Sequence, residues 1–375
     1  MSDSAAPAVL DLLRDLVAID STSGSIGEAE VLRRVAAEFE GVEEARVAFA
    51  PGPDGSPQAL LVVPVGLDPA TPLLVFAAHA DVVPVTDASA WSTDPFSLTP
   101  VGDRLHGRGS SDMKSGLAAA VVAVRSALGQ GAAVALVVTT GEEVGCLGAP
   151  AAAALLSGLA VGAVVIPEST DNEIVLGHRG ALWLTVATAG LAAHGSTPER
   201  GRNAVLDMAR LLVRLEHAGP PLAGHPELGA ETVNVGVISG GGVPNIVPDR
   251  CEIRVDHRVA RDDVAPLIDW WRSQPEVVAV SVDLDLAAVW TRRDHPWLAR
   301  QGAPVSERPA SYFTDGSILV RHIDPDVPVV VWGPGDPTGV HGVDESVSHR
   351  AVLDAVELFE AAALGHPASP AAARR

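Results

Sequence analysis

Residues 73–81 read LLVFAAHAD, an unbroken apolar run that ends in a histidine and an aspartate. The six apolar residues 73–78 predict a strand that is buried on both faces, as the strands of parallel sheets are. Ligand sites of α/β proteins form beyond the carboxyl ends of such strands. His79 and Asp81 point to the same side, and a carboxylate near its second ring nitrogen suits a histidine that binds a metal. A loop histidine beside an aspartate turn is the alternative.

Two more apolar strands lead into carboxylates. The strand expected at 133–139 is followed by Glu142 and Glu143. The strand expected at 161–166 is followed in the same way by Glu168. Adjacent carboxylates at the end of a buried strand are costly unless their charge is neutralised, and a divalent cation would neutralise it. A solvated acidic loop is the other interpretation of this pattern.

Asp112 and His341 lie in loops beside expected secondary structure. Asp112 belongs to the stretch GRGSSDMKSG, residues 107–116, which precedes an apolar helix expected at 116–128. This stretch lacks the ending of a phosphate-binding P-loop, and capping the helix is the simpler role for Asp112. His341 follows a strand that is expected at 327–332.

Five of these residues form a mixed set of nitrogen and oxygen donors: His79, Asp112, Glu143, Glu168 and His341. Two histidines with three carboxylates suit zinc, cobalt or manganese. Calcium prefers oxygen ligands, so the set contains too much nitrogen for that ion.

Around these motifs, strands alternate with helices, which indicates an α/β sheet covered on both faces. After Gly177 the pattern changes to the order β-α-β-β-α-β, which is typical of a small antiparallel sheet with two helices. Its elements are expected at 181–189, 203–217, 232–238, 251–259, 263–273 and 277–287. The first pattern then returns, with a helix near Leu298 and a closing helix at 351–364. We therefore expect a discontinuous catalytic domain, residues 1–178 and 292–375, that carries an inserted domain, residues 179–291.

Composition excludes several classes of protein. The 375 residues are 47% apolar, and 26 basic against 47 acidic residues give a net charge of −21, which speaks against nucleic-acid and anionic-membrane partners. No apolar run reaches the about 20 residues of a membrane helix, and Met1–Pro7 lacks the pattern of a signal peptide. Two cysteines cannot form a disulfide framework. We expect a soluble, cytoplasmic protein whose tail from Gly365 is disordered.

The ordered set of motifs resembles the acetylornithine deacetylase / succinyl-diaminopimelate desuccinylase family of dinuclear zinc metallopeptidases, with carboxypeptidase G and the aminoacylases. The resemblance covers nearly the whole chain and rests on residues 79–84, 91–96, 107–116, 142–143, 168, 194–196, 201–204, 245–248, 256–258 and 333–345. It implies an α/β fold with a zinc-peptidase-like mixed sheet covered by helices, and an inserted α+β domain that serves as dimerisation and lid domain. The chain departs from the family at Gly141, where aspartate is usual, and at Cys146, where glycine is more common.

The resemblance also implies two divalent metal ions per subunit, bridged by Asp112 and by a water or hydroxide. His79 and Glu168 would complete one metal site, and Glu143 and His341 would complete the other. Zinc is the first expectation for both ions, and cobalt or manganese are the alternatives.

Five further roles follow from the same resemblance. Asp81 would orient His79, and Glu142 would act as general base and later as proton donor. In the inserted domain, His194 would stabilise the oxyanion, usually in the site of a neighbouring subunit. Arg258 would hold a substrate carboxylate, and Asn245 would line the same pocket.

The resemblance implies a metal-dependent amidohydrolase, in which a metal-bridging hydroxide attacks the amide of an N-acyl amino acid or a dipeptide. Residues 314–316 and 333–341 look closer to the acetylornithine deacetylase-like members of the family. The resemblance also implies a homodimer. A succinyl-diaminopimelate desuccinylase and a small dipeptidase or carboxypeptidase are alternatives, and a metal-free, non-catalytic binding protein is a remote one.

Overall fold

The computed structural model describes residues 5–367, and its contacts divide the chain into two compact units. Unit 1 consists of Met1–Gly177, Val289–Ala310 and Thr314–Arg375, and unit 2 consists of His178–Ala288 and Ser311–Phe313. The inserted part was predicted at 179–291, whereas unit 2 ends at Ala288 and gains three residues from a later segment. Most of the tail that is expected to be disordered lies outside the described residues.

Unit 1 is built on a mixed six-stranded sheet. Strands β6, β3, β7 and β16 run parallel, and β1 and β2 extend the sheet as an antiparallel pair beside β6. In sheet order the strands are β1 (Ala45–Pro51), β2 (Pro57–Pro64), β6 (Val134–Thr139), β3 (Leu73–His79), β7 (Val161–Ile166) and β16 (Val329–Val331). The structure confirms the predicted α/β fold with a mixed sheet.

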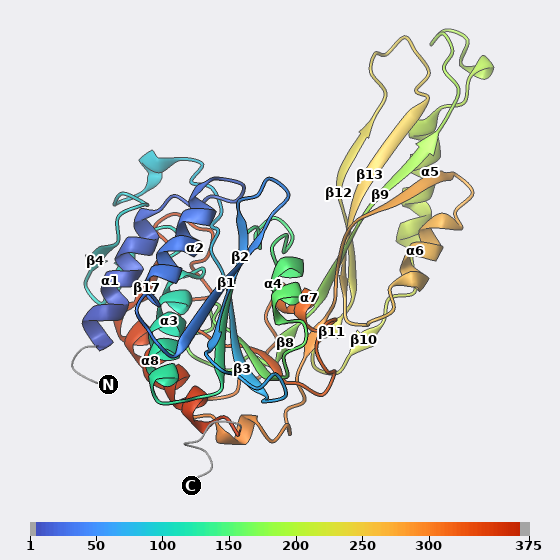
Figure 1. Cartoon of the computed structure of the whole chain (residues 1–375). Coiled ribbons are helices and arrows are strands. Elements are labelled where there is room, and N and C mark those ends of the chain that lie inside the picture. Colours follow the sequence, from blue (N-terminus) through green and yellow to red (C-terminus); the bar gives the residue numbers. More distant parts are fainter. Residues whose placement is uncertain (1–4, 368–375) are drawn as a thin grey trace. The chain divides into compact units, whose positions relative to one another are not determined.

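Helices cover both faces of this sheet (Figure 1). One face carries α1 (Ala5–Ala18), α2 (Gly27–Ala37), α3 (Lys114–Gly129) and α8 (His349–Gly365), and the other carries α4 (Ala149–Leu156) and α7 (Gly316–Leu319). Strand β3 shows why its sequence is wholly apolar. Phe76 packs into the core under α3 and α8, whereas Val75 packs into the core under α4 and α7. None of the helices within residues 5–367 is long and apolar enough to cross a bilayer.

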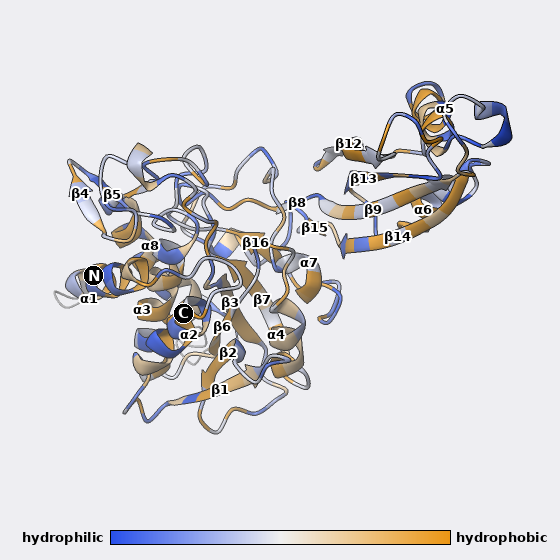
Figure 2. Cartoon of the chain, turned by 90° about the horizontal axis from the view of Figure 1, so that it is seen from above, coloured by the Kyte–Doolittle hydropathy of each residue, from blue (hydrophilic) through white to orange (hydrophobic). Residues whose placement is uncertain are grey.

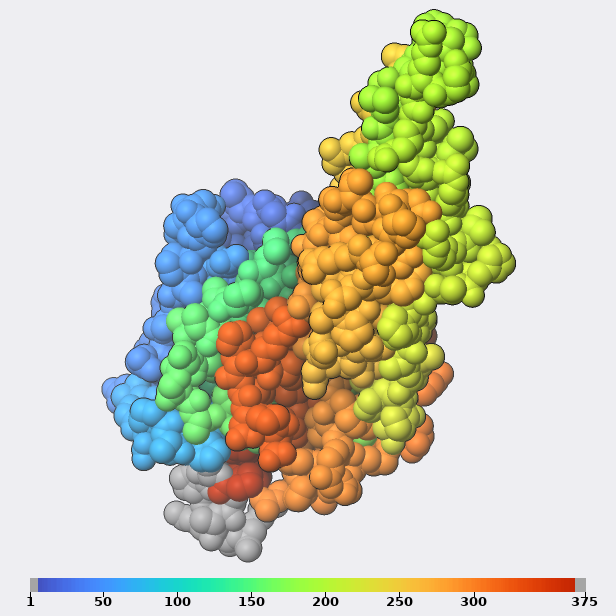
Figure 3. Space-filling view, turned by 90° about the vertical axis from the view of Figure 1, so that its right-hand side faces the viewer, coloured from blue at the N-terminus to red at the C-terminus, as the bar shows by residue number. Residues whose placement is uncertain are grey.

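Segments far apart in the sequence meet on the α4 face. Figure 3 shows α4 in green beside the red-orange segment that contains α7, and Leu156 and Leu319 belong to one apolar cluster. A small antiparallel sheet, ordered β17–β5–β4, joins β4 (Thr99–Val101), β5 (Arg104–His106) and β17 (Ser346–Ser348). Short 3₁₀ turns are η1 (Ala88–Ala90) and η3 (Leu298–Arg300). The helix predicted near Leu298 is therefore only one turn, because Pro296 and Gly302 bound the segment.

Unit 2 has the predicted order, β9-α5-β12-β13-α6-β14, in one antiparallel sheet whose strand order is β12-β13-β9-β14. Met208 and Leu211 of α5 and Trp271 of α6 pack on one face of this sheet. Figure 2 shows apolar residues, in orange, in α5 and in β14. The bounds in unit 2 are β9 (Gly180–Ala189), η2 (Pro198–Arg200), α5 (Ala204–His217), β10 (Gly224–His225), β11 (Gly229–Ala230), β12 (Thr232–Gly240), β13 (Arg250–Val259), α6 (Ala265–Arg272) and β14 (Val277–Leu286). Where the chain passes between the units, β8 (Gly177–His178) pairs with β15 (Val289–Trp290).

Lys114, the single lysine of the sequence, is fully buried at the start of α3. Its Nζ donates hydrogen bonds to the backbone oxygens of Leu16 and Ile19, each at 2.9 Å. Burial lowers the pKa of Lys114 to about 7, because the ammonium has lost its water. The side chain ties the end of α1 to the loop from which α3 begins.

Candidate metal centre

The polar residues predicted to bind metal follow neighbouring parallel strands of unit 1. His79 is the last residue of β3, Glu142 and Glu143 follow β6, and Glu168 follows β7. Because β6, β3 and β7 are adjacent and parallel, their carboxyl ends meet at one edge of the sheet. The order of the strands in the sheet therefore brings these four side chains to one place.

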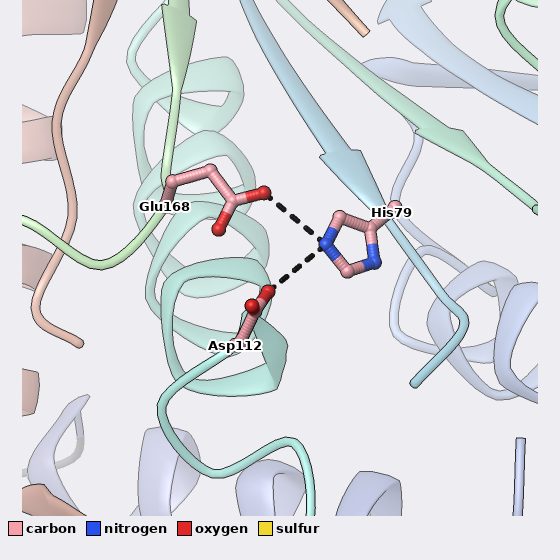
Figure 4. Close-up of side chains that lie close together, drawn as sticks. All are labelled: His79, Asp112 and Glu168. Carbon is pink, nitrogen blue, oxygen red and sulfur yellow. Dashed lines mark hydrogen bonds and ion pairs between the residues drawn. The ribbon is translucent and has the colours of Figure 1, made fainter. Parts of the chain in front are cut away.

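Asp112 reaches the same place because α3 approaches β7 closely. A Cβ on Gly116, in the first turn of α3, would lie 1.7 Å from the backbone oxygen of Pro167. Only glycine allows this approach, which sets Asp112 near Glu168. The His79 Nε2 atom lies 3.2 Å from Asp112 Oδ1 and 3.1 Å from Glu168 Oε1 (Figure 4).

A second trio is formed by Asp112, Glu143 and His341. The His341 Nε2 atom lies 3.1 Å from Asp112 Oδ2 and 3.1 Å from Glu143 Oε2. In each trio the potential ligand atoms all lie within 4.8 Å of one another. Asp112 belongs to both trios and offers a different oxygen to each. The structure thus brings all five predicted ligands together.

The two trios differ in their access to solvent. The side chain of His79 is 2% exposed and that of Glu168 is 5% exposed, whereas the side chain of His341 is 50% exposed. The first trio is therefore closed, and the second is open on its histidine side.

The electrostatics of the cluster fit a centre for divalent cations. Burial raises the pKa of Glu168 to about 8 and raises the pKa of Glu143, since both carboxylates have lost water and repel their acidic neighbours. Hydrogen bonds to Asp112 and Glu143 raise the pKa of His341 to about 10. A positive charge between the carboxylates would therefore stabilise their ionised forms. Mixed imidazole and carboxylate donors are the ligands that zinc and related ions take.

Asp81 makes contacts that the sequence does not reveal. The ring of His79 is held mainly by the backbone oxygen of Asp81, at 3.0 Å from Nδ1, and the carboxylate lies farther away, at 3.6 Å. That carboxylate instead accepts hydrogen bonds from the backbone N–H groups of Glu142 and Glu143, at 3.0 and 3.1 Å, and from the Ser23 hydroxyl at 2.7 Å. Asp81 therefore fixes the turn that carries both glutamates.

Glu142 is buried, and among the described residues it belongs to neither trio. Loss of water raises its pKa well above the ordinary value, and the charges of Asp315 and Glu168 add to the shift. Its Oε1 lies 3.9 Å from the thiol of Cys146. A carboxylate with a raised pKa that is not itself a ligand is suited to accept and return a proton.

His194 lies in unit 2 and is exposed. The backbone N–H of Ser196 donates to its Nδ1 at 3.1 Å, which leaves the ring proton of the neutral imidazole on Nε2. Nε2–H makes no hydrogen bond with any described residue, so it could donate one to an oxyanion.

Asn245 lies beside His194 and not beside Arg258. The backbone N–H of Gly195 donates to the backbone carbonyl oxygen of Asn245 at 2.8 Å, next to an isolated β-bridge between His194 and Ile246. Arg258 lies at the far end of β13, whose ten residues span about 30 Å. The expectation that Asn245 and Arg258 line one pocket therefore fails within a single chain.

Arg258 is held by a small aromatic and acidic cluster within unit 2. Asp256 accepts a hydrogen bond from Arg258 Nε through Oδ2 and one from Trp183 Nε1 through Oδ1, both at 3.1 Å. The guanidinium lies over the ring of Phe313, 5.6 Å from its centroid. The terminal nitrogens of Arg258 make no hydrogen bond with any described residue, so they are available to a carboxylate. Sequence reasoning missed Phe313, because nothing in the pattern joins residues 311–313 to the inserted part.

Residues 75–365 match the profile of peptidase family M20/M25/M40, more than half of the chain. A succinyl-diaminopimelate desuccinylase of Cereibacter sphaeroides is 30% identical over 299 residues, which cover 72% of this chain and 77% of the relative. A protein of Talaromyces marneffei named as a probable carboxypeptidase is 28% identical over 94% of this chain and 86% of its own.

Solved structures share the fold. A metallo-carboxypeptidase of the M20 family from Sulfolobus solfataricus aligns with a TM-score of 0.75 at 19% identity, over 94% of this chain and 98% of that chain. At this identity the likeness concerns the fold alone.

Proposed function

Because the chain belongs to peptidase family M20/M25/M40 and is a hydrolase of amide or peptide bonds, we propose that it removes an N-acyl group from amino acids, as an acetylornithine deacetylase does. One observation carries the proposal: two trios of metal-binding residues share Asp112, and the buried carboxylate of Glu142 lies beside them without joining either.

Two divalent cations would occupy the trios, with zinc first and cobalt or manganese as alternatives. His79, Asp112 and Glu168 would hold one ion, and Asp112, Glu143 and His341 the other. When bound, such ions polarise the substrate carbonyl and lower the pKa of water to about 7.

The chain's own residues supply the proton transfers and the substrate contacts. Glu142 takes a proton from the attacking water and delivers it to the amine nitrogen as the C–N bond breaks. The Nε2–H of His194 donates to the developing oxyanion. The terminal nitrogens of Arg258 bind the carboxylate of the substrate in two parallel hydrogen bonds.

A second candidate is favoured by the relatives. One relative is named as a succinyl-diaminopimelate desuccinylase and another as a probable carboxypeptidase, so succinyl-diaminopimelate and small peptides are alternative substrates.

A substrate screen decides between these candidates. Acetyl-, succinyl- and formyl-amino acids and dipeptides are assayed with added zinc or cobalt, and the metal content of the natively purified protein is measured. We expect acetyl-amino acids to be hydrolysed fastest, with loss of activity on chelation and recovery when metal is returned. Fastest turnover of succinyl-diaminopimelate or of dipeptides would establish the second candidate. Fewer than one transition metal per chain together with no turnover would indicate a metal-free binding protein.

Replacing Arg258 by lysine tests the carboxylate contact. An ammonium cannot form the two parallel bonds of a guanidinium, so Arg258→Lys is expected to lower kcat/KM for substrates with a free carboxylate by about 10–100-fold. The same substrates with the carboxylate converted to an amide are expected to change little. Arg254→Lys, on the same face of β13 and exposed, is the matched control. An equal loss on acids and amides would rule out the contact.

A further inference from the structure

Glu345 is a buried carboxylate to which neither the sequence nor the reaction gives a role. Its side chain is 1% exposed. Its Oε1 accepts hydrogen bonds from the backbone N–H groups of Ser111 and Asp112, each at 2.9 Å. Its Oε2 accepts from the N–H of Gly109 at 3.0 Å and from Arg108 Nη1 at 2.6 Å. Four donors thus occupy the two oxygens, which leaves Glu345 poorly placed to bind a metal itself.

The backbone of Glu345 holds the same loop. Its carbonyl oxygen accepts from the N–H of Gly107 at 3.0 Å and from the Ser110 hydroxyl at 3.3 Å. Immediately beyond, Ser346 of β17 pairs with His106 of β5. The loop from Gly107 to Asp112 is therefore fastened along its length to one residue, 233 positions away from Asp112.

Glu345 also ends the loop that carries His341. The neighbouring residue Asp344 accepts hydrogen bonds from the backbone N–H and the hydroxyl of Ser92, at 2.8 and 2.7 Å. The His341 loop is thus fixed at its end by Asp344 and Glu345, three and four residues beyond the histidine. The two loops bring His341 Nε2 to 3.1 Å from Asp112 Oδ2.

We infer that Glu345 is a positioning residue that fixes the Asp112 loop against the His341 loop, so that one aspartate can serve two metal sites. The inference rests on the proposed function, because it presumes two cations at the trios. Groups that orient metal ligands typically contribute 10–100-fold to metal affinity. Since Asp112 is shared, loss of its support weakens both sites.

Glu345→Gln tests the inference in the full chain. The amide keeps one accepting oxygen and turns an NH₂ group toward two donors. Glu231→Gln is a matched control, because Glu231 is equally buried, accepts from the N–H groups of Ala223 and Ala260, and pairs with Arg261, all within unit 2.

Binding of Co²⁺ and of Zn²⁺ to the metal-free proteins is followed by calorimetry and by the visible absorption of cobalt. For Glu345→Gln we expect affinity for both ions to fall by about 10–100-fold and the cobalt spectrum to change. Glu231→Gln is expected to bind both ions as tightly as the unaltered chain does, even if its melting temperature falls by as much as that of Glu345→Gln.

The outcomes separate the inference from the proposed function. If the unaltered chain binds no second ion, the proposed function fails. If it binds two ions and Glu345→Gln binds them equally well, only the inference fails. Should Glu345→Gln not fold, Arg108→Gln removes one of the four donors, and unchanged metal affinity in that variant would overturn the inference.

Discussion

Glu142→Ala is expected to lower turnover of N-acyl amino acids by about 10²–10⁴-fold, the usual contribution of a general base, while both metal ions stay bound. The reason lies in the turn after β6. Asp81 holds the backbone of Glu142 and Glu143, but only Glu143 reaches a trio of potential ligands. The two adjacent glutamates therefore have different tasks. Steady-state kinetics together with metal analysis of the purified variant measures both.

Glu143→Ala is the matched comparison, because it removes the neighbouring carboxylate from the same turn. We expect it to lose metal from the second trio, and its activity with it. Glu142→Gln keeps the size of the side chain and should behave as Glu142→Ala does. A Glu142→Ala protein that retains near-native turnover, or that loses its metal instead, would reverse the roles of the two residues.

His194→Ala is expected to lower kcat by about 10²–10³-fold with metal content and melting temperature unchanged, as loss of one oxyanion donor does. We propose that the chain forms a homodimer through unit 2, which brings His194 to the site of the other subunit. Leu206 and Val213 support this, since they are 53% and 55% exposed and lie seven residues apart on α5. His217→Ala, another exposed histidine of unit 2, is the control and should be fully active.

Mixing chains tests whether His194 acts across the dimer. A His194→Ala chain keeps Glu142, and a Glu142→Ala chain keeps His194, so a mixed dimer contains one complete site. Random exchange makes about half of the dimers mixed, and about a quarter of the native activity should return. Absence of recovery despite demonstrated exchange, or a monomer at assay concentration, would mean that His194 acts within its own chain or not at all.

The fold could be predicted because each buried strand of the sheet is visible in its own short stretch of sequence. Residues 73–78, 134–138 and 161–166 are continuous runs without a polar side chain, and each run is followed within a few residues by a predicted ligand. Strand β1 was not predicted because it lies at the sheet edge, where all of its residues are partly or fully exposed and none belongs to a buried run. The segment near Leu298 was predicted as a helix but forms only one 3₁₀ turn, because its few apolar residues lie within a single turn.

The site was less predictable wherever contacts join distant segments. Asp315 lies in a motif that the sequence analysis connected only with substrate choice. In the structure it is buried, and it accepts a hydrogen bond from Thr139, 176 residues away, beside Glu142. Asn245 and Arg258 show the opposite case, because only thirteen positions separate them in the sequence, yet Asn245 precedes β13 and Arg258 lies near the other end of that strand. Separation in sequence therefore says little about separation in the site.

The single buried lysine gives the molecule an internal reporter. An endoprotease that cleaves only after lysine has one target in the whole sequence, the bond between Lys114 and Ser115, which lies in the first turn of α3. Both residues are fully buried. Cleavage into two fragments can then proceed only from states in which the α1–α3 contact has opened, two residues away from Asp112. The rate of this single cleavage would measure how often the segment next to Asp112 opens, without any chemical label on the protein.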